Sequence, residues 1–331
     1  MIRYIIILLT FFPTVTFSEI VTLNDAINVA INYYRGNIVP EQFNKKIITD
    51  YVKAINPESI QYKIDSLVIE DITVSYYFNF KPTGVLIISK NLAFEQPHWF
   101  AIEGHADLKQ FEITHRGING NISTFSIDKS RSNFSYNSRT QKPKKEAVEK
   151  WNRYKINPND FNPEITNKGK VSFQNVRNVA INYYRQNTAP NQYHKGIISD
   201  YNEAIRLKNI KYEVDSLVIE NKTVCYYFNF KPKGTIEVNA VYSIEPVSGW
   251  SEEGNINIKQ AYLHRNDPGV ISLIQFDTSN RRYQKYNDLP TYEIMLKWNE
   301  YQVDPKIFKL ENNGADVTPD GGNLDYNDSR E

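Results

Sequence analysis

Residues that can act as nucleophiles are scarce, because the chain contains a single cysteine, Cys225. A thiol attacks a substrate only as the thiolate, which requires a neighbouring base or positive charge. Cys225 lies in the middle of a run that reads as a β-strand, and the residue 150 positions earlier is Ser75. The pattern therefore favours a small side chain on the face of a sheet, and one cysteine excludes an intramolecular disulfide.

Histidine is the second candidate for catalysis or metal binding, and the chain has five. His115 and His264 occupy nearly matching places in the two halves of the chain, whereas His98, His105 and His194 have no matching copy. A zinc site requires a motif such as HExxH or a cluster of His and Cys, and the sequence has neither. We expect strand-edge histidines that face solvent, and neither a metal nor a cofactor.

Paired carboxylates could do acid–base chemistry if their surroundings separated their pKa values. Asp65 and Glu70 begin and end the segment DSLVIE, which recurs with Asp215 and Glu220. Positions five apart on one strand point to opposite faces, so these residues read as turn and edge residues. The sequence also lacks a phosphate loop, a dinucleotide fingerprint and a nucleophile elbow. It therefore predicts a protein that is not an enzyme.

The strongest signal is an internal duplication. The segment NVAINYYR occurs at 28–35 and again at 178–185, and 36 of the 62 positions in 28–89 are identical to those in 178–239. Two repeats of this length fit the 331 residues of the chain. The predicted organisation is as follows: a signal peptide at 1–18, repeat 1 at 20–158, a linker at 159–170, repeat 2 at 171–310 and a disordered tail at 311–331.

Helices are predicted at both ends of each repeat. In repeat 1 Asn24 or Asp25 can cap a helix over 26–35, and a weaker helix covers 41–55. A closing helix over 144–154 presents Ala147, Trp151 and Tyr154 on one face. Trp151 and its counterpart Trp298 are expected in the core.

Strands are predicted between these helices. The period of the apolar residues changes to two after Tyr62, and we expect Val74, Tyr76, Phe78 and Phe80 on one side of a strand. A turn at 81–84 leads to a return strand, and further short strands follow at 111–114 and 122–127. Helices, then an antiparallel sheet, then a helix define an α+β fold in each of the two tandem repeats.

The first residues resemble a secretory signal peptide. Arg3 is followed by an apolar run over 4–12 and by small residues that end at Ser18. The run is too short to span a bilayer of about 30 Å. We therefore expect a secreted or periplasmic bacterial protein, peripheral to or outside the membrane. A formal net charge of +1 offers no field that would recruit nucleic acid.

The strand, hairpin and return strand of each repeat resemble the propeptide of the streptopain (C10) family of cysteine proteases and the related Spi-type inhibitors. In repeat 2 the resemblance rests on the strand and turn 226–234, on Glu245-Pro246-Val247 and on the segment GWSEEG at 249–254. Repeat 1 has PHWFAIEG at 97–104 in its place. The helices at NVAINYYR and the Trp-x-x-Tyr helices fit the opening and closing segments of the family.

The resemblance implies a protein partner and a place where it binds. The protease domain of the family is absent from the sequence, so the expected function is to bind and inhibit a cysteine protease by covering its active-site cleft. A non-inhibitory envelope or adhesion module that reuses the fold is the alternative. The candidate partner-binding residues lie in the loop after the return strand: Pro246, Gly249, Trp250, Ser251 and Gly254 in repeat 2, and Pro97, Trp99 and Gly104 in repeat 1.

Trp99 and Trp250 are open to two interpretations at this stage. A tryptophan in this loop either fills a gap in the core or stands exposed as an anchor that carries binding energy.

Overall fold

The computed structural model describes residues 21–69, 71–92, 95–116, 122–127, 143–163, 169–219, 221–257, 262–267, 270–275 and 288–310. The predicted signal peptide, the predicted disordered tail and residues 164–168 of the predicted linker lie outside these ranges. The chain divides into two compact units, Met1–Gly169 with Tyr286–Leu296, and Lys170–Lys285 with Lys297–Glu331. Within the described ranges, no helix has the length and apolar character needed to cross a bilayer.

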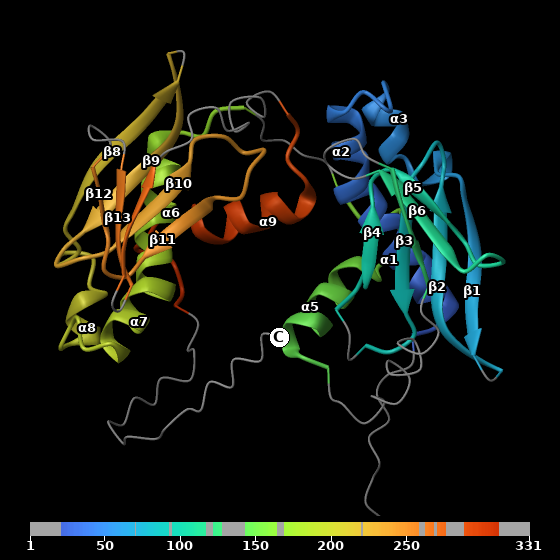
Figure 1. Cartoon of the computed structure of the whole chain (residues 1–331), viewed down its shortest axis with the longest axis horizontal. Helices are drawn as coiled ribbons and strands as arrows, with labels where there is room; N and C mark the ends of the chain where they lie inside the picture. Colours follow the sequence, from blue (N-terminus) through green and yellow to red (C-terminus); the bar gives the residue numbers. More distant parts are fainter. Residues whose placement is uncertain are drawn as a thin grey trace, which may run out of the picture. The chain divides into compact units, whose positions relative to one another are not determined.

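Both units have the predicted α+β fold (Figure 1). Unit 1 contains helices, a four-stranded antiparallel sheet in the order β1-β2-β3-β4 and a three-stranded sheet in the order β5-β6-β7. Its elements are α1 Leu23–Tyr33, the π-helix η1 Tyr34–Ile38, α2 Val39–Asn44, α3 Tyr51–Ile55, η2 Pro57–Ser59, β1 Tyr62–Ile69, β2 Ile72–Phe80, β3 Val85–Ser89, β4 Trp99–Ala101, β5 Gly104–Asp107, β6 Glu112–Arg116, β7 Ile122–Ser126 and α5 Lys145–Tyr154.

Unit 2 repeats this order, with the sheets β11-β10-β9-β8 and β12-β13-β14. Helix α9 (Tyr292–Tyr301) contributes its first residues to unit 1 and its last to unit 2. The other elements are α6 Phe173–Tyr183, the π-helix η4 Tyr184–Thr188, α7 Ala189–His194, α8 Tyr201–Ala204, β8 Tyr212–Ile219, β9 Lys222–Phe230, β10 Thr235–Asn239, β11 Val247–Ser251, β12 Asn255–Asn257, β13 Tyr262–Asp267 and β14 Val270–Gln275.

Two predicted helices are wrong in detail. Helix α1 starts at Leu23, because the cap is Thr22, whose side chain accepts a hydrogen bond from the backbone N–H of Asp25. The single helix predicted over 41–55 is two short helices. Lys46 takes a left-handed φ of 60°, which ends α2, and Asp50 caps α3.

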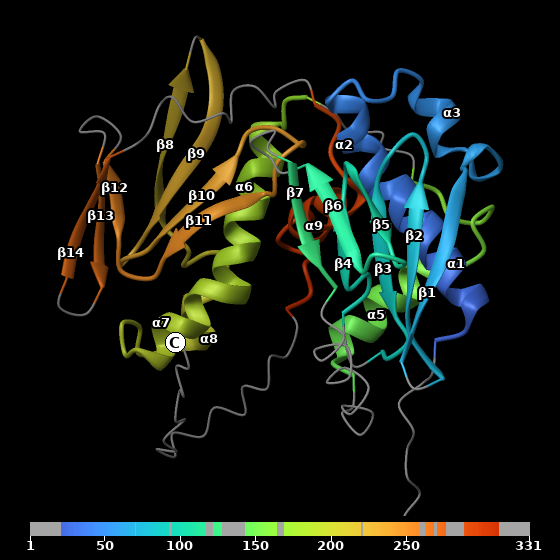
Figure 2. The ribbon, with the colours of Figure 1, turned by 45° about the vertical axis from the view of Figure 1, so that its right-hand side comes forward.

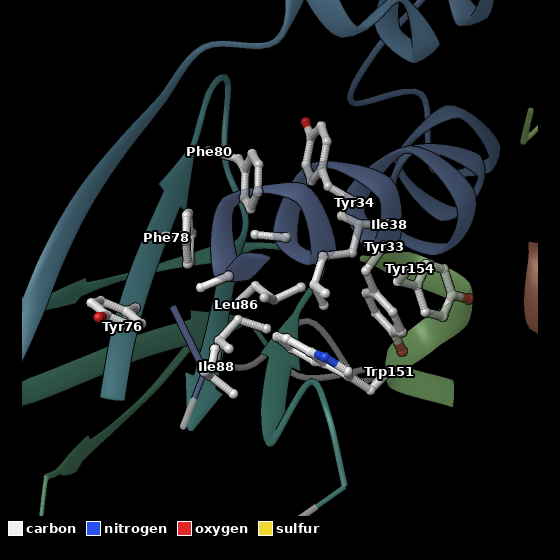
Figure 3. Packing of buried hydrophobic residues seen from close by; sticks show 14 of the residues in the cluster. Tyr33, Tyr34, Ile38, Tyr76, Phe78, Phe80, Leu86, Ile88, Trp151 and Tyr154 are labelled. Atoms are coloured by element: carbon white, nitrogen blue, oxygen red, sulfur yellow. The ribbon is translucent and has the colours of Figure 1, made fainter. Parts of the chain in front are cut away.

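The main sheet of unit 1 is covered on both faces. On one face, side chains of β2 and β3 pack against α1 and α5, as Figure 3 shows for Phe78, Leu86, Tyr33 and Trp151. On the other face, alternate residues of the same strands form a second cluster with Ala106 of β5 and its neighbours. Figure 2 shows the strands β5–β7 beside this face of the main sheet.

One predicted strand face is also wrong. Val74 does not share a face with Tyr76, Phe78 and Phe80, because it belongs to the cluster on the opposite face, with Tyr77. A β-bulge causes this difference, since Leu67 pairs with Ser75 and the next residue, Val68, pairs with Thr73. The extra residue in β2 reverses the alternation of side chains before it.

Polar side chains of α1 and η1 hold the segment that closes the repeat. Asn32 is fully buried, and its Nδ2 donates to the carbonyls of Tyr154 and Ile156, at 2.8 Å each. Arg35 donates through Nε to the carbonyl of Ile55 and through a terminal nitrogen to that of Pro158. These side chains satisfy the last carbonyls of α5 and α3, at Tyr154 and Ile55, and two carbonyls of the segment that follows α5.

Unit 2 contains the same contacts at equivalent positions. Asn182 donates to the carbonyls of Tyr301 and Val303, at 2.8 Å each. Arg185 donates to the carbonyls of Ile205 at 3.0 Å and Pro305 at 2.9 Å. The identical NYYR segments therefore carry the same structural role in both repeats.

The two hydrogen bonds from Asn32 to the closing segment generate a stability prediction. The variant Asn32→Ala leaves two backbone carbonyls without their donor, so we expect the free energy of unfolding of unit 1 to fall by about 2 kcal/mol. Asn28→Ala is the matched control, because Asn28 makes one partly exposed bond to the carbonyl of Lys155. It should cost less than about 1 kcal/mol. Urea denaturation measures the free energy of unfolding of both variants. Equal losses would contradict this role of Asn32.

Candidate partner-binding edges

The predicted partner-binding loop contains a short strand in each repeat. Strand β4 pairs with β3, with Leu86 opposite Phe100. Strand β11 pairs with β10 in the same way, with Ile236 opposite Trp250. Each strand lies at one edge of its sheet. The predicted segments therefore contain edge strands rather than an irregular loop.

The register shows how the two repeats match. Phe100 occupies the place of Trp250, and Trp99 occupies the place of Gly249. Phe100 is 42% exposed and Trp250 is 44% exposed, although both pair with residues that are fully buried. The interpretation of Trp250 as an exposed residue therefore agrees with the structure. Trp99 is partly buried, and its indole packs against the cluster that contains Ala101.

A buried glutamine positions each edge strand. In repeat 2 the Nε2 of Gln192 donates to the carbonyls of Lys233 and Glu252, at 2.7 Å each, and thereby joins the β9–β10 turn to the end of β11. Gln42 makes the same two bonds in repeat 1. A side chain on Gly234 would lie 2.8 Å from the Gln192 amide, and its φ of +108° also favours glycine.

The structure gives Gly104 and Gly254 roles in backbone packing. A Cβ on Gly104 would collide with the carbonyl of Thr114, and its φ is +155°. Gly254 is buried, and its carbonyl accepts from the hydroxyl of Thr235 at 2.8 Å. Ser251 accepts at its Oγ from the backbone N–H of Gly254 at 3.0 Å.

Pro246 and Pro97, the two prolines among the predicted partner-binding residues, are both buried but lie in different surroundings. The carbonyl of Pro246 accepts from the N–H of Asn239 at 2.9 Å, just before β11 begins. Pro97 lines a groove in repeat 1 of about 320 Å³. Its lining residues come from β4, the segment before it and two helices: Tyr33, Glu95, Pro97, His98, Trp99, Phe100 and Lys150. The groove brings together Pro97 and Trp99 among the predicted residues.

Charged groups at this groove are paired. The Nζ of Lys150 lies 2.7 Å from Glu95 Oε1 and 5.8 Å from the ring centre of Tyr33. Burial, and then the charges of Glu293 and Glu95, raise the pKa of Tyr33. His98 is exposed overall, but desolvation of its imidazole lowers its pKa. At neutral pH both Tyr33 and His98 are therefore uncharged. The ion pair recurs in repeat 2 as Lys297 with Glu245, at 2.6 Å.

The other chemical candidates remain packing residues in the structure. Cys225 is fully buried and packs with Tyr227 and Leu217. His115 lies 5.8 Å from the ring of Trp99, edge to face. Trp151 and Trp298 are in the core, as predicted. Among the residues that the structure describes, no three His, Cys, Asp or Glu side chains gather where they could hold a metal.

Sequence reasoning missed Phe100, Tyr33 and Lys150 at this edge. The constant offset of 150 residues between the repeats extends through this segment and pairs Phe100 with Trp250. That count alone would have identified Phe100. Tyr33 and Lys150 come from distant helices, and no local pattern connects them to β4.

No protein-family model matches this chain, and neither a curated protein nor a solved structure is found to be similar to it.

The glutamine contact generates a prediction about the edge strand. The variant Gln192→Ala leaves the carbonyls of Lys233 and Glu252 without their donor, so β11 should open more often. Amide hydrogen exchange in Val247–Ser251 should become faster by about tenfold or more, which corresponds to about 1.4 kcal/mol. Asn191→Ala is the control, since the side chain of Asn191 donates to the carboxylate of Glu252 and not to a backbone carbonyl. Equal exchange rates in the two variants would contradict this role.

Proposed function

We propose that this protein is an exported, non-catalytic binding protein that inhibits a cysteine protease of the streptopain type by covering its active-site cleft. The observation that supports the proposal is the pair of exposed aromatic residues, Phe100 and Trp250, at the same register of the outer strand in two repeats. The resemblance of the strand, hairpin and GWSEEG segments to a C10 propeptide supplies the class of target.

Edge strands with an aromatic residue are well suited to bind another protein. The outer strand can pair with an extended segment of a partner through backbone hydrogen bonds, and a large side chain adds an anchor. Tryptophan is among the residue types that most often carry binding energy at interfaces. In repeat 2 the anchor stands on a strand that Gln192 and the β9–β10 turn hold in place. Little ordering would therefore be required on binding.

The main chain of the edge supports an inhibitor rather than a substrate. Pro246 is buried just before β11, and its carbonyl accepts from the backbone N–H of Asn239. At the other end, the carbonyl of Glu252 accepts from the Nε2 of Gln192 at 2.7 Å. A segment held at both ends resists the extended, mobile conformation that a protease requires for cleavage.

An inhibition assay with matched variants tests the proposal. The purified protein is mixed with a C10 cysteine protease, and initial rates on a peptide substrate give the inhibition constant. Trp250→Ala should raise this constant about 10- to 100-fold, since loss of a buried aromatic anchor costs about 2 kcal/mol. Phe100→Ala tests the corresponding position of repeat 1.

Val218→Ala is the control for repeat 2, because Val218 is 53% exposed on the opposite edge of the same sheet. It should leave inhibition unchanged. Absence of inhibition by the unaltered protein at micromolar concentration, together with no complex in size-exclusion chromatography, would refute the proposal for that target. Hydrolysis of substrate by this protein alone would refute its non-catalytic character.

A further inference from the structure

Unit 1 includes a short segment from late in the chain. Residues Tyr286–Leu296 come after the strands of repeat 2 in the sequence, yet they belong to unit 1. Asn44 of α2 binds the main chain of this segment twice. Its Nδ2 donates to the carbonyl of Leu289, and its Oδ1 accepts from the N–H of the same residue, at 2.9 Å each. A side-chain amide carries both a donor and an acceptor, so one asparagine holds this stretch of backbone as a neighbouring strand would.

The far end of the segment is held by its backbone and by a carboxylate. The N–H of Glu293 donates to Asn37 Oδ1 at 3.1 Å, and the hydroxyl of Tyr154 donates to Glu293 Oε1 at 2.8 Å. Nitrogens of Lys150 and Arg153 each lie 3.9 Å from the same carboxylate. This surface therefore contacts both the main chain and an acidic side chain of the segment.

Between these contacts, Tyr292 lies against Gly36. A Cβ at position 36 would lie 2.9 Å from the Cβ of Tyr292, which is closer than real Cβ atoms come. The φ of Gly36 is outside the left-handed region, so the backbone itself does not require glycine there. The centre of the Tyr292 ring also lies 5.0 Å from that of Phe161 and 5.9 Å from that of Tyr154. The close approach of Tyr292 therefore explains the glycine.

Repeat 2 lacks three residues of this site, and repeat 1 lacks the tyrosine that fills it. The three differences are these: Gly36, Asn44 and Arg153 stand where repeat 2 has Gln186, His194 and Glu300. The segment before the closing helix of repeat 1 reads KPKKE at 142–146, where the later segment reads LPTYE at 289–293. The proline and the glutamate are common to both, and a lysine takes the place of the tyrosine. The combination of site and ligand therefore occurs once in the sequence and is not a by-product of the duplication.

We propose that this surface of unit 1 is a peptide-binding site, and that the chain closes it with its own segment 289–293. The ligand class is a peptide of the pattern Pro-x-Tyr-Glu, in which Pro290 is buried, Tyr292 packs on Gly36 and Glu293 meets the basic side chains. In such sites main-chain bonds supply affinity, and contacts with side chains supply specificity. Because the segment is part of the same chain, its effective concentration is on the order of millimolar, so a free peptide competes poorly with it.

A peptide titration of the full protein tests the site. The double variant Tyr292→Lys and Glu293→Lys removes the ring and places positive charge beside two basic side chains, so the segment should leave the site. A fluorescent peptide with the sequence of residues 288–296 should then bind this variant at least about tenfold more tightly than it binds the unaltered protein. Fluorescence anisotropy measures both affinities. The matched control is a peptide with the sequence of residues 141–149, which has lysine in the place of the tyrosine and should not bind.

Further changes in the double variant locate the binding. Asn44→His introduces the residue of repeat 2 and should weaken the 288–296 peptide about fivefold or more, since it removes both main-chain bonds. Asn28→Ala is the control, because Asn28 donates to the carbonyl of Lys155, which lies outside the site. It should leave the affinity unchanged. No saturable binding to a folded double variant, or equal binding of the two peptides, would overturn the inference.

Amide hydrogen exchange tests the closed site in an otherwise unaltered chain. Gly36→Ala adds a single methyl group where Tyr292 approaches, so exchange at the N–H groups of Leu289 and Glu293 should become about tenfold faster or more. Gln186→Ala, at the matching place of repeat 2, should leave both rates unchanged. Unchanged rates in Gly36→Ala would overturn the inference even if the double variant does not fold. Neither experiment contains a protease, so this inference and the proposed function can fail separately.

Discussion

The fold of each repeat depends on how the first helix holds the last segment. Asn32 and Arg35 in repeat 1, and Asn182 and Arg185 in repeat 2, project from the opening helix and bind carbonyls more than a hundred positions away. Because the end of a helix and the turn after it leave carbonyls without local partners, a buried closing segment needs donors from elsewhere. The opening helix supplies them, and its neighbouring residues Tyr33 and Tyr34 pack into the same core (Figure 3).

This constraint determines the position of the outer strand. The opening and closing helices are joined over one face of the sheet. From α2 or α7, the side chain of Gln42 or Gln192 therefore reaches the hairpin turn and the end of the outer strand. The asparagine in the second strand, Asn79 or Asn229, then holds β5 or β12 through two hydrogen bonds to the backbone of Ala106 or Ile256. The same polar contacts therefore position the exposed aromatic residue of the outer strand in both repeats.

Duplication with a changed outer strand fits a division of tasks between the repeats. The residues that hold the frame are identical in both copies, whereas the four residues at 97–100 differ from their counterparts. Phe100 and Trp250 are exposed on their outer strands, so a change at this position alters recognition at little cost to stability. Two linked binding edges would also raise the avidity for a single large partner or for a repeated one.

Much of the fold follows from local patterns. The period-two runs, the Pro-Gly turn and the apolar face of the closing helix were sufficient to predict the α+β class, the hairpin and the buried tryptophans at 151 and 298. The break between α2 and α3 was missed, because it depends on a left-handed residue at Lys46 that has no strong local signal. The side on which Val74 points was also missed, since a bulge is defined by pairing with another strand.

The amino-acid sequence by itself determined that the chain holds two copies of one α+β unit, because identity at a constant offset and the periodicity of apolar residues are properties of the linear chain. Only the tertiary structure decided that Phe100 and Trp250 are exposed on outer strands, and that Tyr33 and Lys150 join β4 around one groove. The reason is physical: exposure and neighbourhood depend on strand register and helix packing, which bring together residues that no local pattern connects.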